Sequence, residues 1–367
     1  MESMHFADEL GPFRIVHLHR PDAGLRATVV VDNIACGPAL GGVRMAPDAS
    51  TEEAVRLARA MTFKNAAAAL PHGGGKAVIR ADPRMPAAEK ERLVRAFAAA
   101  IKELTDYIPG PDMGTDELCA AWIHDEIGRS AGLPSVLGGI PLDELGATGV
   151  GLAAAVDVAR SFIGLELEGA RVVVQGFGAV GKHAARALVE RGAVLVGACD
   201  SRGAVADPRG LDVDALIALK AQGRSVTDLP GVKRLERDAV IELECDIWIP
   251  AARPDVIHMD SVGRLKTKLV APGANIPCTP DAERALFSRG VLVLPDFVAN
   301  AGGVICAATE VHGGTRKDAF DRVEEKIRHN VRVVLEESRR AGVPPREAAV
   351  AIAEERVRAA MRTRRFR

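Results

Sequence analysis

The chain has 367 residues, 48% of them hydrophobic and 26% charged, so it is long enough to form two domains that each bury a core. Its 48 basic and 49 acidic residues leave a formal net charge of −1, which does not favour nucleic acid or an anionic membrane surface as a partner. No apolar run approaches the roughly 20 residues that cross a bilayer, so we expect a globular protein without membrane contact.

The first third of the sequence predicts an N-terminal α/β domain. Residues 13–36 are expected to form two strands, joined at 21–24 by a Pro-Asp-x-Gly turn in which proline presets φ and glycine accepts a positive φ. A glycine-rich link follows, and Ser-Thr-Glu-Glu at 50–53 matches the capping box that opens a helix. A strand over 76–81 and an amphipathic helix over 87–105 complete the pattern.

From residue 140 onward, strand and helix patterns alternate as they do in a parallel α/β sheet. The apolar run at 171–175 is typical of a buried parallel strand, and a helix over 179–191 follows it. Further predicted strands lie at 194–199, 246–250, 268–271 and 291–294. A long amphipathic helix is expected over 318–340.

The predicted fold class is therefore α/β with two domains. We expect an N-terminal substrate and oligomerisation domain over 1–140, to which C-terminal helices at 325–367 return. A Rossmann-type dinucleotide-binding domain is expected over 141–324.

A glycine loop lies between the predicted strand and helix of the second domain. It fits the pattern G-x-G-x-x-G at six consecutive residues: Gly176, Phe177, Gly178, Ala179, Val180 and Gly181. The first glycine makes the turn, the second lets the backbone approach a pyrophosphate, and the third lets helix and strand pack closely. The loop could alternatively serve only as a tight strand-to-helix turn.

The end of the next predicted strand bears on the choice of cofactor. Asp200, followed by Ser201, lies 24 residues beyond Gly176, where an acid accepts hydrogen bonds from the adenosine ribose and repels a 2′-phosphate. This favours NAD as the cofactor. Arg202 could instead pair with that phosphate, so NADP stays possible.

Two lysines lie in a segment that is rich in glycine and alanine. Lys64 follows a helical pattern, and Lys76 closes a run of three glycines. A lysine crowded by a second ammonium group becomes a usable base, so a glycine-walled site near Lys64 would let Lys76 activate a water. Asp112, after a predicted strand end, is a second acid/base candidate. Taken singly, a helical lysine is more often a solvated side chain.

Six segments occur in the order found in one enzyme family: MTFKNAAAALPHGGGK, PDMGT, GATGVG, QGFGAVG, PGANIPCT and LPDFVANAGGV. With them the whole chain resembles the glutamate/leucine/phenylalanine/valine dehydrogenase family. The resemblance implies reversible oxidative deamination of an L-amino acid to a 2-oxo acid and ammonia, with a nicotinamide as hydride acceptor. It implies that Lys64 binds the substrate α-carboxylate, that Lys76 promotes attack of water on the iminium, and that Asp112 carries protons to and from the amine.

The resemblance also implies the residues around the nicotinamide. Thr148 would contact the nicotinamide end of the cofactor, while Asn275 and Asn300 would lie along the nicotinamide and the substrate. A cleft between two domains would then exclude water from hydride transfer.

Two positions depart from the glutamate-specific members of that family. Leu40 replaces a lysine and Ala307 replaces a serine, and those two polar residues hold the side-chain carboxylate of glutamate in those members. An unpaired carboxylate in an apolar pocket costs several kcal/mol. With Gly41 and Val304, these residues would line an apolar pocket, so an apolar branched-chain or aromatic L-amino acid is the predicted substrate.

Two alternatives stay open. The segments ATGVG and GACDSRG look more like the glutamate branch, so glutamate dehydrogenase is the first alternative. The second is a dinucleotide-binding regulator without catalysis, which has no need of Lys64, Lys76 and Asp112 together.

The six cysteines show no CxxC spacing, which predicts separate thiols, no metal site and a cytoplasmic location. The expected partners are the amino acid, the 2-oxo acid, ammonia and further copies of the chain, because relatives are homo-oligomers.

Overall fold

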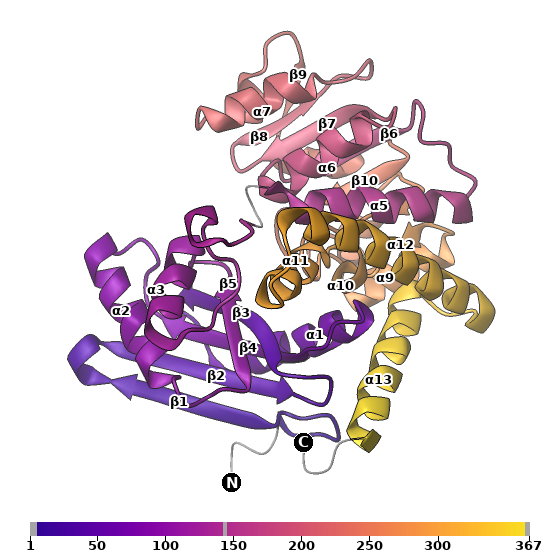
Figure 1. The fold of residues 1–367 in the computed structure, drawn as a ribbon. Coiled ribbons are helices and arrows are strands. Elements are labelled where there is room, and N and C mark those ends of the chain that lie inside the picture. Colours follow the sequence, from indigo (N-terminus) through magenta and orange to yellow (C-terminus); the bar gives the residue numbers. More distant parts are fainter. Residues whose placement is uncertain (1–5, 142–144, 364–367) are drawn as a thin grey trace. The chain divides into compact units, whose positions relative to one another are not determined.

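The structure is a computed structural model that describes residues 6–141 and 145–363. The chain divides into two compact units (Figure 1). The first unit comprises Met1–Leu142, Val304–Phe320 and Val350–Arg367, and the second comprises Asp143–Gly303 and Asp321–Ala349. This division differs from the expected boundaries at 140 and 325, because 304–320 groups with the first unit and 321–349 with the second. Of the C-terminal helices, only the part from residue 350 onward returns to the first unit.

The first unit contains a five-stranded sheet of order β1-β2-β4-β3-β5. Its strands are β1 (Arg14–Arg20), β2 (Leu25–Asn33), β3 (Ala39–Ala46), β4 (Gly73–Arg80) and β5 (Tyr107–Pro111). β2 pairs antiparallel with β1 and β4, whereas β3 pairs parallel with β4 and β5. The predicted turn is confirmed as a short 3-10 helix at Pro21–Ala23, ended by Gly24 at φ +67°.

The predicted glycine-rich link after β2 is wrong, because this segment is the inner strand β3. A Cβ atom on Gly41 would lie 1.7 Å from the backbone oxygen of Gly75 in β4. A Cβ atom on Gly42 would lie 2.7 Å from the Cβ atom of Asp112. These glycines are therefore required in a strand, because neighbouring segments approach the backbone closely at both positions.

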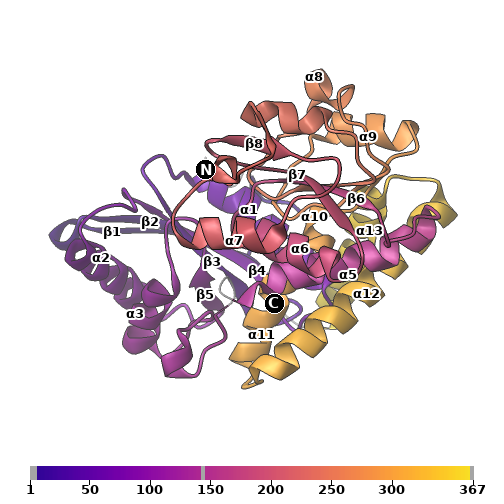
Figure 2. The ribbon, with the colours of Figure 1, turned by 90° about the horizontal axis from the view of Figure 1, so that it is seen from above.

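Helices cover both faces of this sheet, as the alternation of its side chains requires. Val30 and Val78 pack with α1 (Thr51–Ala67), while their neighbours Val29 and Val31 face the opposite side. On that side, α2 (Ala87–Ala100) and α3 (Glu117–Ile127) lie next to each other (Figures 1 and 2). The predicted N-cap is confirmed at α1, where the backbone N–H of Glu53 donates to the Ser50 side chain.

The second unit contains a seven-stranded sheet of order β12-β11-β10-β6-β7-β8-β9. Its strands are β6 (Arg171–Gln175), β7 (Val194–Asp200), β8 (Gly203–Ala206), β9 (Lys233–Leu235), β10 (Ile247–Pro250), β11 (Leu269–Val270) and β12 (Leu292–Val293). The five strands from β12 to β7 are parallel and were all predicted, whereas the antiparallel edge strands β8 and β9 were not. The strand order reverses beside β6, where open α/β sheets bind nucleotides.

Helices surround this second sheet. Those of both units not yet named are α5 (Ala147–Phe162), α6 (Ala179–Val189), α7 (Val213–Ala221), α8 (Met259–Val262), α9 (Pro280–Ser288), α10 (Asp296–Ala299), α11 (Gly302–Val311), α12 (Arg316–Ala341) and α13 (Pro345–Thr363). Short 3-10 helices lie at Ser135–Leu137 (η3), Val226–Asp228 (η4) and Arg237–Glu242 (η5). α5 and α12 lie side by side, since a Cβ atom on Gly151 would be 2.5 Å from Cδ1 of Ile327 (Figures 1 and 2).

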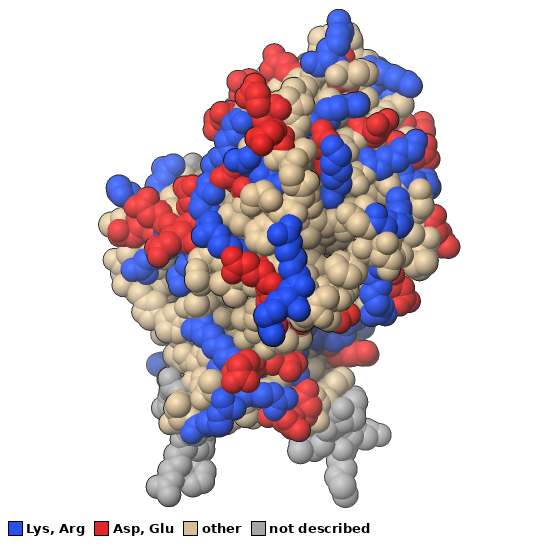
Figure 3. All heavy atoms as spheres, turned by 90° about the vertical axis from the view of Figure 1, so that its right-hand side faces the viewer, with Lys and Arg blue, Asp and Glu red and all other residues tan. Residues whose placement is uncertain are grey.

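The surface agrees with the balanced composition. On the face drawn in Figure 3, Lys and Arg side chains alternate with Asp and Glu side chains, and neither sign covers a broad area alone. Within the described residues, no helix is both long enough and apolar enough to span a membrane. The six cysteines all lie in described segments and form no disulfide there.

Candidate functional site

The first unit brings Lys76 and Asp112 together. The ammonium Nζ of Lys76 lies 2.5 Å from Oδ2 of Asp112, and the lysine is only 6% exposed. Lys76 belongs to β4, and Asp112 directly follows β5. Because β3 lies between these parallel strands, the two side chains meet above β3, where Gly42 leaves room for Asp112.

Arg44 is a third member of this cluster, and sequence reasoning missed it. Its Nε donates to Oδ2 of Asp112 at 3.3 Å, and its Nη1 donates to Oε1 of Glu53 on α1 at 2.5 Å. Arg44 lies two residues after Gly42 on β3, so side-chain alternation would have revealed it if β3 had been recognised as a strand. Two cations therefore face one carboxylate, which is buried to all but 20% of its side chain.

The cluster sets the ionisation of Asp112. Burial opposes the charged form, but the charges of Lys76 and Arg44 outweigh it and hold the pKa of Asp112 below its ordinary value. The carboxylate is therefore ionised at neutral pH and accepts hydrogen bonds or protons. The predicted acid/base candidate Asp112 is thus the ionised partner of the Lys76 ammonium.

Leu40 lies on the same sheet face as this cluster. Leu40 and Arg44 are four residues apart in one strand, so both point to the face that α1 covers. In register, Leu40 pairs with Gly74, two residues before Lys76. Its neighbour Gly41 faces β4 backbone and has no side chain to offer a pocket.

Lys64 lies on α1 between two residues that fix this helix to the sheet. The Asn65 side chain donates to the backbone oxygens of Leu40 and Gly73 at 3.2 and 2.7 Å. The Thr62 hydroxyl donates to Oδ2 of Asp32 at 2.6 Å. These hydrogen bonds fix the part of α1 that contains Lys64 over the strands that carry Leu40 and Lys76.

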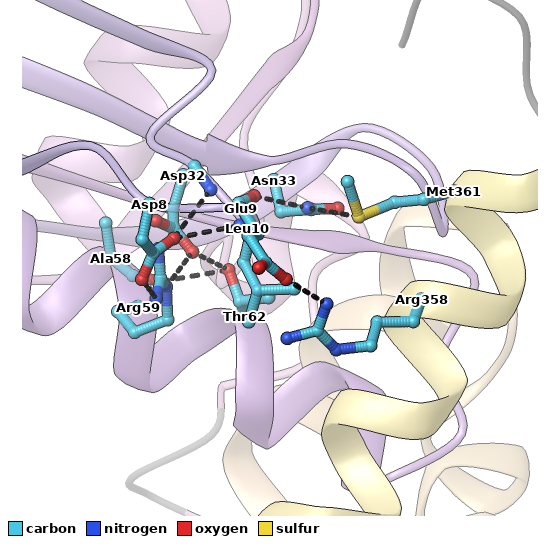
Figure 4. Close-up of polar contacts among 11 residues, drawn as sticks. Asp8, Glu9, Leu10, Asp32, Asn33, Ala58, Arg59, Thr62, Arg358 and Met361 are labelled. Atoms are coloured by element: carbon cyan, nitrogen blue, oxygen red, sulfur yellow. Dashed lines mark hydrogen bonds and ion pairs between the residues drawn. The ribbon is translucent and has the colours of Figure 1, made fainter.

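An ionic network that runs from buried Asp32 to the exposed residues Asp8 and Glu9 completes this anchoring (Figure 4). Asp32 is fully buried on β2, and its Oδ2 also accepts from Nε of Arg59 at 2.8 Å. The other nitrogens of Arg59 donate to both oxygens of Asp8 at 2.6 and 2.8 Å. Arg358 of α13 pairs with Glu9 at 2.5 Å, so the N-terminal segment joins α1, β2 and α13.

The other two residues of the expected apolar pocket lie on α11. Ala307 is buried and Val304 is half-buried. Glu310 holds this helix by accepting from the backbone N–H groups of Leu133 and Ile140 at 3.0 and 2.7 Å. These contacts and those of Leu40 all belong to the first unit.

The glycine loop of the second unit has the geometry that a dinucleotide requires. Gly176 adopts φ +100° at the end of β6, and a Cβ atom on Gly181 would lie 2.0 Å from the oxygen of Gly176. Around Gly178, by contrast, a Cβ atom would meet nothing within 4 Å. The helix that begins there, α6, has no side-chain cap. The loop thus leaves open space at a helix N-terminus, where phosphate groups bind.

Asp200 ends β7 beside this loop, since the N–H groups of Gly176 and Phe177 both donate to the oxygen of Cys199. Its carboxylate points at the chain's own donors. Lys220 donates to it at 2.8 Å, and Val226, Ser225 and Arg202 donate at 2.9 to 3.0 Å. Ser201 is exposed.

The remaining predicted residues lie around the start of α5 and the loop after β11. The Asn300 amide nitrogen donates to Oδ1 of Asn275 at 3.0 Å and to the oxygen of Ala274 at 3.1 Å. Oδ1 of Asn300 is buried and has no hydrogen-bond partner in the part of the chain that the structure describes. Thr148 lies in the first turn of α5, with its hydroxyl 3.4 Å from a Cβ atom built on Gly303. A carboxamide donor would satisfy the Asn300 oxygen, so these residues fit a nicotinamide.

Sequence comparisons assign the chain to a family. A profile described as "Glutamate/Leucine/Phenylalanine/Valine dehydrogenase" matches residues 138–365, and "Glu/Leu/Phe/Val dehydrogenase, dimerisation domain" matches residues 12–129. A glutamate dehydrogenase of Aeropyrum pernix is 38% identical and covers 90% of this chain and 85% of its own. No cluster of three or more potential metal ligands occurs within 6–141 and 145–363.

Solved structures agree. Hetero-hexameric glutamate dehydrogenase from Thermus thermophilus matches with a TM-score of 0.87 and 33% identity, over 97% of this chain and 91% of its own. L-tryptophan dehydrogenase from Nostoc punctiforme matches with a TM-score of 0.75 and 26% identity, over 98% and 99%. Both NADP-specific and NAD-specific glutamate dehydrogenases, from Saccharolobus shibatae and Staphylococcus aureus, are 36% identical over 90% of this chain. The chain therefore belongs to the glutamate/leucine/phenylalanine/valine dehydrogenase family and is an NAD(P)-dependent amino acid dehydrogenase.

Proposed function

We propose that this chain oxidatively deaminates an L-amino acid at the cluster of Lys76, Asp112 and Arg44. The observation that carries the proposal is the 2.5 Å ion pair between Lys76 and Asp112, which joins a cation and an ionised acid on one face of the first sheet. A nicotinamide, when bound, would supply the acceptor for the hydride that leaves the substrate Cα. Every proton transfer is left to the protein.

The two groups of the ion pair suit different steps. The Asp112 carboxylate accepts a proton from the substrate ammonium, so that the nitrogen lone pair becomes available. Lys76, once its ammonium has lost a proton, accepts the proton that the attacking water gives up as its oxygen bonds to the iminium carbon. Asp112 then returns its proton to the amine nitrogen of the carbinolamine, so that ammonia leaves as the carbonyl forms. Lys64 is proposed to bind the α-carboxylate, because its helix is fixed over the same strands.

The cofactor is proposed to bind along the glycine loop that begins at Gly176. The open space at Gly178 suits the pyrophosphate, and the unpaired Oδ1 of Asn300 suits the carboxamide of the nicotinamide. Thr148 and Asn275 are proposed neighbours of that ring. Further copies of the chain are proposed partners, since one matching profile is named for dimerisation and the Thermus relative is described as hetero-hexameric.

Glutamate is the substrate that the relatives favour. The Aeropyrum protein and the NAD-specific and NADP-specific relatives all bear the name glutamate dehydrogenase. One related structure, from Nostoc, is named L-tryptophan dehydrogenase, so the amino acids named for related structures include one with a large aromatic side chain.

An apolar amino acid is the second candidate, and Leu40 is the observation that favours it. Leu40 is 3% exposed and lies on the same face of the sheet as Lys76. It pairs with Gly74, two residues before Lys76 in β4. An aliphatic side chain at position 40 offers no partner to the side-chain carboxylate of glutamate. Burial of that carboxylate without a cation would cost several kcal/mol.

The first experiment tests the reaction. Lys76→Ala should lower turnover by roughly 10²- to 10⁴-fold, the usual contribution of a general acid or base. NADH binding should be unchanged, because the glycine loop belongs to the other unit. Lys102→Ala, which removes an exposed lysine, is the matched control. Unchanged turnover in Lys76→Ala would reject Lys76 as the catalytic group.

The second experiment separates the substrate candidates. The wild-type protein is assayed with glutamate, leucine, valine and phenylalanine, followed by the absorbance of reduced nicotinamide. Leu40→Lys should raise kcat/KM for glutamate relative to leucine by about tenfold or more, since it adds a charge partner. Leu40→Met conserves volume and serves as the control. If Leu40→Lys leaves the ratio unchanged, position 40 does not select the side chain.

A further inference from the structure

We infer that Lys220 sets the nucleotide preference of this chain by forming an ion pair with the Asp200 carboxylate, so that the site accepts NADP(H) as well as NAD(H). The inference rests on the cofactor site of the proposed function. It concerns the adenosine end of that site, where an acid ordinarily accepts the ribose hydroxyls and excludes a 2′-phosphate.

The Asp200 carboxylate has no acceptor capacity left for a ribose. Oδ1 accepts from the backbone N–H of Arg202 at 2.9 Å and from the Ser225 hydroxyl at 3.0 Å. Oδ2 accepts from Nζ of Lys220 at 2.8 Å and from the backbone N–H of Val226 at 3.0 Å. A carboxylate offers about four lone-pair sites, and all four are used. The side chain is also only 8% exposed.

The ion pair with Lys220 removes the charge that would repel a phosphate. Lys220 lies in the last turn of α7, and its side chain is 28% exposed. A paired and largely buried carboxylate exerts a much weaker repulsion on a nearby anion than a free one does. Asp200 therefore keeps its place at the end of β7 without its usual effect on nucleotide choice.

Arg202 supplies the group that a 2′-phosphate requires. Asp200 pairs with Gly203 across the β7–β8 hairpin, so Ser201 and Arg202 form its two-residue turn. Both are exposed, and within the described residues the Arg202 guanidinium makes no hydrogen bond or ion pair. A guanidinium close to the adenosine ribose is the usual partner of a 2′-phosphate.

The test measures binding of NADH and NADPH to the full-length protein, by the fluorescence of the reduced nicotinamide and without an amino acid. Wild-type dissociation constants should agree within about tenfold, because the charge that separates them is neutralised. Lys220→Met should weaken NADPH relative to NADH by about tenfold, since it exposes the carboxylate charge. A wild-type preference for NADH above roughly a hundredfold would overturn the inference.

Two further variants define how Lys220 acts. Lys268→Met removes a similar ion pair, formed with Asp246 at 2.8 Å. This pair lies at the amino ends of β10 and β11, whereas Asp200 lies at the carboxyl end of β7, so the ratio of the NADPH and NADH dissociation constants should be unchanged. In an Asp200→Asn background, Lys220→Met should lose its effect, because no carboxylate charge remains to be exposed. An equal loss of NADPH binding in that background would mean that Lys220 contacts the phosphate directly, and would overturn the inference.

The outcomes are separable from those of the proposed reaction. Retained NADH binding by each variant shows that the domain is folded. A protein that binds both nucleotides and turns over no amino acid would contradict the proposed reaction and leave the inference intact. Turnover with NAD alone, together with strong discrimination in binding, would do the reverse.

Discussion

Glycines of the first sheet and Gly178 of the second unit serve opposite purposes. In the first sheet, a Cβ atom on Gly41 would lie 1.7 Å from backbone of β4, and one on Gly74 would lie 2.0 Å from backbone of α1. In the second unit, a Cβ atom on Gly178 would meet nothing within 4 Å. Gly41 and Gly74 allow segments of the chain to touch, while Gly178 leaves open space where α6 begins.

This difference explains where each site obtains its chemistry. The crowded first sheet brings charged side chains together, because Lys76 and Asp112 meet across the strand that contains Gly42. The second sheet offers backbone groups at a helix N-terminus and few charges in the loop itself. Glycine patterns in one chain therefore predict packing in one place and ligand binding in another.

The comparison predicts its largest effect for a pair of alanine substitutions. Gly41→Ala should destabilise the protein by about 3 kcal/mol or more, because its Cβ atom would overlap backbone that cannot move away. Gly178→Ala should change stability by less than about 0.5 kcal/mol, since φ is −91° and the surroundings are open. Thermal unfolding measures both.

The same pair should separate in the opposite direction when cofactor binding is measured. Gly178→Ala should weaken NADH binding by at least about tenfold, because its methyl group enters the space meant for the pyrophosphate. Gly41→Ala, measured below its unfolding temperature, should bind NADH normally. Equal loss of stability in both variants would contradict the distinction between packing and ligand-binding glycines.

Arg44 offers the next largest effect and tests the charge cluster of the first sheet. Arg44→Met removes one of two cations beside Asp112, so the pKa of Asp112 should rise and the acid limb of the kcat/KM profile should move to higher pH. Turnover at neutral pH should fall by about tenfold. Arg44→Lys should restore part of both properties.

A matched control for Arg44 comes from the opposite face of the sheet. Arg95 on α2 pairs with Glu91, Asp125 and Glu126, away from the α1 face. Arg95→Met should leave the pH profile unchanged. A profile that is the same in Arg44→Met and the wild type would show that Arg44 does not act through Asp112.

The sequence predicted the second sheet well because its parallel strands are short apolar runs between helices. Residues 171–175 and the glycine loop at 176 were located from this pattern alone. The first sheet was harder, since β3 carries adjacent glycines that resemble a link. Arg44 was missed for the same reason. Side chains alternate along a strand, so Arg44 is recognised as facing the same side as Gly42 only when the segment is known to be a strand.

Long-range partners were beyond prediction. The Asp200 carboxylate pairs with Lys220 and Val226, which lie 20 and 26 residues away, on segments for which the sequence predicted no helix or strand. The C-terminal division was also not predictable. A 3.6-residue period identifies the helix at 318–340, found as Arg316–Ala341, without saying which core its apolar face joins.

The smallest expected effect concerns the exposed rim of the first unit. Hydrogen bonds from Arg59 lower the pKa of Asp8 to about 2, against the opposing effect of burial. Because the folded pKa lies below the unfolded value of 3.8, the stabilisation is present above about pH 4 and is lost as the pH falls toward 2. Solvent screening limits it to less than about 1 kcal/mol, since the Asp8 side chain is 53% exposed.

Asp8→Asn therefore tests whether an exposed ion pair contributes to anchoring α1. The variant should unfold at a slightly lower temperature than the wild type at neutral pH, and the two should converge as the pH falls from about 4 to 2. The more deeply buried Asp157, which pairs with Arg328 in the second unit at 2.5 Å, should give a larger loss on the same change to asparagine. A difference for Asp8→Asn that persists unchanged at acid pH would mean that the side-chain shape, and not its charge, holds Arg59 in place.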